Sequence, residues 1–165
     1  MKKITFLALL SVLTLSSIAQ NKFGHINAQD ILILMPEYKT AEIDLENFTK
    51  SLQAQLGSME AEFQQMQQEY QANETIYTDL VKQDKESEIQ GLYQRIQTFQ
   101  QNAQKSLQTK EQEMLEPILA KARKAIEDVA TEGNYTYIFD KSIGSILYAK
   151  ESENVIELVK KKLGL

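Results

Sequence analysis

The sequence predicts a mainly α-helical fold with a small β body, in which a long antiparallel two-helix coiled-coil arm projects from a small β-strand base. The apolar positions in the middle of the chain are mirrored about residues 84–85, so that Leu80 matches Ile89 and Phe63 matches Leu107. Within each half, apolar residues alternate three and four apart, which is the spacing of a coiled-coil seam. Short segments near both ends have instead the aromatic and β-branched content of strands.

Residues 1–19 have the pattern of a secretory signal peptide. Lys2 and Lys3 precede an apolar run over residues 4–15, and Ser17 and Ala19 supply the small side chains expected before a cleavage site. The apolar run is too short for a membrane-spanning helix. We therefore expect cleavage before Gln20 and export of the mature chain.

The mature chain is acidic. Without Lys2 and Lys3, 16 basic side chains remain against 23 acidic ones, a formal charge of −7. Residues 40–116 alone carry 14 acidic and 6 basic side chains, and glutamine fills many of their outer positions. This balance argues against nucleic acid as a partner. The sequence has no cysteine, so packing rather than disulfide bonds must stabilise the fold.

Residues 20–35 form the first part of the predicted β-rich body. Residues 23–27 are a candidate for a short strand, and residues 28–35 resemble a small apolar helix that ends before Pro36. Pro36 suits the first turn of the next helix, because the first backbone N–H groups of a helix have no partner within it.

Residues 36–132 form the predicted arm, with its tip near residues 84–85. Each helix would hold about 45 residues and extend about 65–70 Å. The predicted seam departs from the heptad on both helices at one level, where Gly57 and Pro117 lie. Both residue types weaken a helix. We predict a hinge in this band.

Residues 133–165 complete the body. Gly133-Asn134 is expected to end the second long helix, residues 135–140 to form a strand, residues 146–149 a returning strand, and residues 153–163 a last helix. Three short strands and two short helices bury too little apolar surface to be stable alone, so we expect the body to associate with copies of itself. The side chains predicted to line that association are Phe23, Ile26, Ile138, Phe139, Ile146 and Tyr148.

The residue types that enzymes use are scarce. His25 is the only histidine, and in a short strand near the mature terminus it is expected to be structural or solvent-facing. We find no nucleophile elbow, phosphate-binding loop or paired metal-ligand motif. Acidic pairs such as Glu60 and Glu62 point about 200° apart on a helix, too far to share an ion. We therefore expect no enzyme activity, no catalytic residues, no metal and no cofactor.

The chain resembles the Skp/OmpH-like periplasmic chaperones over nearly all of its mature length. The resemblance rests on the strand and short helix at the start and on Pro36-Glu37-Tyr38-Lys39, which opens the arm. Its more specific part is the C-terminal pattern, which comprises Glu116-Pro117-Ile118-Leu119, Ala125-Ile126, Val129-Ala130, Gly133, Tyr135, residues 137–140 and Leu147-Tyr148.

The resemblance implies a homotrimer whose β-strand body holds three helical arms. It also implies that these arms enclose unfolded outer-membrane β-barrel proteins in the periplasm, acting as a holdase without ATP, metal or catalysis. The candidate contacts with such clients are the apolar residues left off the seam, namely Ile43, Ile76, Val81, Tyr93, Leu115 and Leu119.

Two features depart from the family pattern. Glu153-Asn154-Val155 replaces a short phrase before the last helix, and the arm is acidic where better-studied relatives are basic. The acidic arm argues against contact with lipopolysaccharide or anionic lipid, and membrane contact stays undecided. A second hypothesis is an exported coiled-coil structural or adaptor protein that binds one folded partner. The sparse off-seam apolar residues favour the holdase, because a single specific partner favours a dense hot spot.

Overall fold

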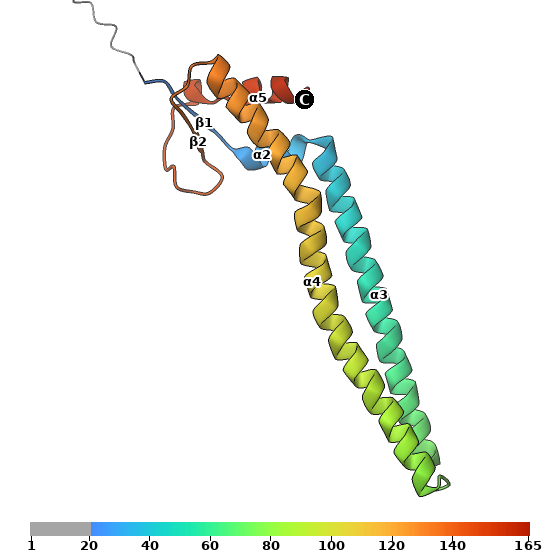
Figure 1. Cartoon of the computed structure of the whole chain (residues 1–165). Helices are drawn as coiled ribbons and strands as arrows, with labels where there is room; N and C mark the ends of the chain where they lie inside the picture. Colours follow the sequence, from blue (N-terminus) through green and yellow to red (C-terminus); the bar gives the residue numbers. More distant parts are fainter. Residues whose placement is uncertain (1–20) are drawn as a thin grey trace, which may run out of the picture. The chain divides into compact units, whose positions relative to one another are not determined.

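The computed structural model describes residues 21–165, so the predicted signal peptide lies outside the described residues. The fold is mostly helical, as predicted, with two long helices in a hairpin and one pair of short strands (Figure 1). The contacts divide these residues into two compact units, which are described separately below. We call residues 29–124 the hairpin unit, and residues 21–28 with 125–164 the strand unit.

The hairpin unit is built on α3 (Pro36–Asn73) and on most of α4 (Asp79–Glu132), preceded by α2 (Ala28–Leu34). Pro36 occupies the first turn of α3, as predicted. The two long helices run antiparallel, side by side (Figure 1). Their buried side chains lie along a narrow seam and include Ala41, Leu92, Ile96, Ile118 and Ala122. The predicted coiled-coil hairpin is therefore confirmed.

The turn of the hairpin corrects the predicted tip. It spans residues 74–78, whereas residues 84–85 lie inside α4. Residues 82–88 are mostly good helix formers, and Lys85 and Glu88 form an ion pair one turn apart. Thr78 instead begins the new helix, because its Oγ1 accepts a hydrogen bond of 3.4 Å from the Val81 N–H and its carbonyl one of 2.9 Å from Lys82.

The pairing between the two helices shifts accordingly. The ring of Phe63 lies against Tyr93, and not against Leu107 fourteen positions further along α4. Tyr70 likewise donates a hydrogen bond to Glu86 rather than facing Phe99. Fourteen residues are two heptads, and a seam that repeats every seven residues matches equally well after such a shift. The mirrored pattern therefore indicates a hairpin but cannot fix its register.

The strand unit contains β1 (Phe23–Ile26) and β2 (Tyr137–Asp140), which pair in parallel with Phe23 opposite Tyr137 and Ile26 opposite Asp140. The end of α4 leads into β2 through a Schellman motif. Asn134 takes the left-handed conformation (φ 52°), and the Tyr135 N–H donates to the Ala130 carbonyl at 2.9 Å. The predicted helix end at Gly133-Asn134 is confirmed.

A third strand is absent from the described residues, which contradicts the prediction for residues 146–149. This segment belongs to a loop in which Leu147 and Tyr148 are 97% and 86% exposed. A strand needs a neighbour for its backbone hydrogen bonds, and within one chain none reaches this segment. The glycine-containing turn before it is present, because Gly144 has a φ of 71° and donates its N–H to Lys141.

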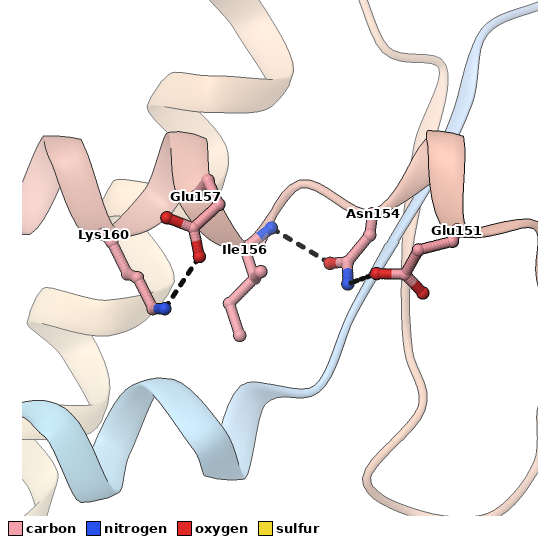
Figure 2. A network of polar contacts seen from close by, with 5 residues as sticks. All are labelled: Glu151, Asn154, Ile156, Glu157 and Lys160. Carbon is pink, nitrogen blue, oxygen red and sulfur yellow. Dashed lines mark hydrogen bonds and ion pairs between the residues drawn. The ribbon is translucent and has the colours of Figure 1, made fainter.

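The last helix, α5 (Ile156–Leu163), follows a single turn of 3-10 helix, η2 (Glu151–Glu153). Figure 2 shows that Asn154 connects the two: its Oδ1 accepts from the Ile156 N–H at 3.1 Å, and its Nδ2 donates to Glu151 at 2.8 Å. Lys160 and Glu157 add an ion pair on α5. The phrase that departs from the family pattern thus still starts the helix.

Candidate functional site

The predicted client contacts all lie in the hairpin unit, spread along its length. Ile43, Ile76, Val81, Tyr93 and Leu119 are exposed, and Leu115 is half-buried. Ile76 and Val81 share the turn region with Leu80, which the sequence analysis did not select. The mirrored pattern pairs Leu80 with Ile89 in the seam, across the incorrectly predicted tip at residues 84–85. In the structure, Leu80 is 77% exposed.

A groove lies on the hairpin near the turn. Its volume is about 460 Å³, and its lining is Phe63, Gln67, Tyr70, Gln71, Glu86, Ile89, Gln90 and Tyr93. The Phe63 and Tyr93 ring centroids are 5.9 Å apart, so Tyr93 is a wall of this groove rather than an isolated side chain. The hydrogen bond that Tyr70 donates to Glu86 raises the pKa of Tyr70 to about 12.

A second pocket lies at the opposite end of the hairpin, between the start of α3 and the later part of α4. Its volume is about 440 Å³, and it is lined by Glu37, Thr40, Ala41, Asp44, Met114, Pro117, Ile118 and Lys121. Lys121 forms an ion pair with Glu37, and the hydrogen bond within this pair lowers the pKa of Glu37.

The hinge candidates do not share one level. Pro117 lies beside Ala41 in this second pocket, whereas Gly57 is sixteen residues further along α3, about 24 Å at the helical rise. The facing seam irregularities were inferred from the incorrect register. Gly57 and Pro117 are therefore two separate positions, each inside an unbroken helix.

The strand unit presents three aromatic rings on one side of its sheet. Phe23 and Tyr137 stack with centroids 6.1 Å apart and planes at 9°, and Phe139 lies 5.9 Å from Tyr137. All three rings are exposed. Tyr137 was missed in the sequence, although its alternation with Phe139 along one strand could have placed it on the same face.

The other predicted body residues are distributed unevenly. Ile26 is only 2% exposed and belongs to the core of the single chain, while Ile138 and Ile146 are half-buried. Tyr148 is exposed in the loop after β2, near Leu147 in the sequence. The exposed large apolar side chains of this unit are thus the three aromatic rings, the loop residues Ile143, Leu147 and Tyr148, and Leu158 on α5.

His25 is buried and has a structural position, which is one of the two predicted alternatives. It is 2% exposed, and its Nε2 lies 2.9 Å from the carbonyl oxygen of Lys150. Its own carbonyl accepts the Val155 N–H at 3.0 Å. Through these bonds β1 holds the segment that precedes α5.

Two negative findings apply to residues 21–165. No helix there combines the length and the apolar character that a bilayer-spanning segment needs. The same residues contain no group of three or more His, Cys, Asp or Glu side chains placed to hold a metal ion.

The comparisons with known proteins agree with one another. The Chaperone protein Skp of Yersinia enterocolitica is 23% identical over 148 residues, which cover 90% of this chain and 89% of that protein. A crystal structure of an OmpH-like protein from Caulobacter crescentus superposes with a TM-score of 0.76 at 14% identity, covering 87% of this chain and 83% of the other. At that identity the superposition shows a shared fold. Residues 22–163 match the family described as Outer membrane protein (OmpH-like), and the chain therefore belongs to the OmpH-like family.

Proposed function

We propose that the chain is an ATP-independent periplasmic holdase that binds unfolded outer-membrane β-barrel proteins between its helical arms and prevents their aggregation. Membership of the OmpH-like family and the similarity to a protein named as a chaperone support this function. The predicted signal peptide supports the location. The proposed activity is non-catalytic.

The positions of the exposed apolar side chains on the hairpin unit support binding of unfolded chains, which family membership alone does not show. The exposed large apolar side chains of the hairpin unit are spread over all of its elements: Ile33 and Leu34 on α2, Ile43 on α3, Ile76, Leu80 and Val81 around the turn, and Tyr93 and Leu119 further along α4. Dispersed apolar contacts with an acidic, glutamine-rich background give weak adhesion at many points, which suits a client without fixed structure. A single folded partner would favour one compact patch.

The active assembly is proposed to be a homotrimer joined through the strand unit. The stacked rings of Phe23, Tyr137 and Phe139 and the exposed Leu147 and Tyr148 support self-association, because aromatic residues are enriched in protein interfaces. A second copy could also supply the backbone partner that residues 146–149 lack in one chain.

Dilution of unfolded β-barrel proteins from urea tests the function. We expect the mature chain, without ATP, to suppress the light scattering of several unrelated unfolded β-barrel proteins. A serum albumin at the same mass concentration controls for nonspecific protection. Protection of none of them, together with tight binding of one folded protein, would favour the adaptor hypothesis instead.

A further inference from the structure

The pocket between the start of α3 and the later part of α4 has an apolar floor and, at its border, two carboxylates that differ in their partners. Ala41 and Ile118 are buried beneath it, and Met114 and the Pro117 ring complete its apolar surface. On α3, Glu37 and Asp44 border the pocket seven residues apart, which is two helical turns or about 10 Å.

One of the two carboxylates has an ion-pair partner and the other does not. Glu37 is already neutralised by Lys121, which also borders the pocket. Asp44 is exposed and has no hydrogen bond or ion pair to any side chain within residues 21–165. The pocket therefore presents an apolar surface whose one uncompensated charge is negative. The hairpin unit as a whole has 16 acidic and 10 basic side chains, so its net charge is negative, like that of the pocket.

An arginine side chain fits this combination. Its three-carbon stem can lie on apolar surface while the charged head stays at the rim, and the planar guanidinium pairs with a carboxylate through two parallel hydrogen bonds. A purely apolar side chain would fill the floor but would partly desolvate Asp44 without giving it a partner, which is unfavourable. An acidic side chain would be repelled.

We propose that this pocket anchors an arginine side chain of the bound unfolded polypeptide, with the stem on Met114, Pro117 and Ile118 and the guanidinium on Asp44. The inference rests on the proposed holdase function and names the type of client residue that one site on the hairpin selects. It also assigns a use to the acidic character of the hairpin, since the anchor favours clients that carry basic residues among apolar ones.

A matched pair of peptides tests the anchor. Each is an extended Gly/Ser peptide of about twelve residues with one central Leu-X-Leu, a fluorescent label and X as either arginine or citrulline, which keeps the shape and removes the charge. Fluorescence anisotropy with the full mature chain is expected to give about two- to fivefold tighter binding of the arginine peptide, the range of an exposed ion pair.

Asp44→Asn is expected to abolish this preference. Asp84→Asn, which makes the same change on the exposed side of α4 outside the pocket, is expected to preserve it. An equal affinity of the two peptides for the unmodified chain, or an unchanged preference in Asp44→Asn, would overturn the proposal. So would a change in the sedimentation of Asp44→Asn without any change in peptide binding, because the pocket would then be a contact between copies.

The aggregation assay, run on the same samples, distinguishes failure of the arginine anchor from failure of the holdase function. If the unmodified chain suppresses aggregation but shows no preference for the arginine peptide, only the anchor is wrong. If it suppresses no aggregation, the holdase function is wrong whatever the peptides do.

Discussion

Asp140, the last residue of β2, connects this strand to the following turn at Ser142 and to the start of α2 at Ala28. Its carboxylate accepts hydrogen bonds from the Ser142 N–H and hydroxyl, both at 2.8 Å, and from the Ala28 N–H at 3.2 Å. Partial burial by itself raises the pKa of this carboxyl, but the bonds from Ser142 and Ala28 outweigh that effect and the net pKa is lowered. The charged carboxylate is thus the form that the folded strand unit prefers.

Replacing Asp140 by Asn should therefore destabilise the strand unit in a pH-dependent way. Because the folded pKa lies below the unfolded one, the stabilisation is fully present above about pH 4 and is lost as the pH falls through the folded pKa. At pH 7 we expect a loss of about 1 kcal/mol in the free energy of unfolding. Urea unfolding of the unmodified chain and of Asp140→Asn, at pH 7 and at pH 3, measures this loss. A difference in unfolding free energy between the two that persists undiminished at pH 3 would contradict the role given to the charged carboxylate.

At the residue scale the sequence predicts helix ends better than strand faces. Pro36 and Gly133-Asn134 carry local backbone preferences, and the structure has them where expected. Ile26 was assigned to an interface between copies, yet it lies in the core of one chain. Alternation along a strand separates two faces, but it does not say which face the chain covers itself.

At the scale of elements, the position of the turn was the main error. Apolar periodicity indicates two helices and their antiparallel sense, but it repeats every seven residues and so allows several registers. The capping residue Thr78 was a usable signal that the mirrored pattern obscured. The missing third strand has a different cause, since a strand is defined by pairing and no sequence shows whether its partner belongs to the same chain.

The turn is expected to depend on Thr78. Thr78→Ala removes the side-chain acceptor for the Val81 N–H and should cost about 1 kcal/mol. Hydrogen exchange should speed up in residues 79–83 and stay unchanged in the strand unit. Thr75→Ala, in the same turn but without a capping bond, is the control. Equal exchange rates in the two variants would show that Thr78 does not fix the turn.

Gly57 and Pro117 are now proposed as two separate positions at which the helices of the hairpin are less stable. Gly57→Ala should stabilise its part of α3 by about 0.5–1 kcal/mol, because no side chain or backbone atom obstructs the added methyl group. Pro117→Ala should restore a backbone hydrogen bond in α4. Because the two sites lie about 24 Å apart, their effects on hydrogen exchange should be local and additive. Unchanged exchange in both single variants would remove the basis for a hinge.

At the scale of the whole molecule, the assembly is expected to depend on the aromatic surface of the strand unit. Phe139→Asp places a charge among the stacked rings of Phe23 and Tyr137, which an interface would have to desolvate. Sedimentation should change from about three chains to one. Ile76→Asp, at an exposed apolar position of the hairpin, should leave the assembly intact. A full-size assembly of Phe139→Asp would place the interface elsewhere.

The central claim is that the hairpin unit holds polypeptides because they are unfolded. A photo-crosslinking amino acid at Ile43 or Leu119, and in separate samples at Glu153 in the strand unit, tests it with one β-barrel protein offered either unfolded or already folded in detergent micelles. We expect crosslinks from the two hairpin positions to the unfolded form, and few from Glu153 or to the folded form. Equal crosslinking of the folded protein, or crosslinks confined to Glu153, would contradict the account.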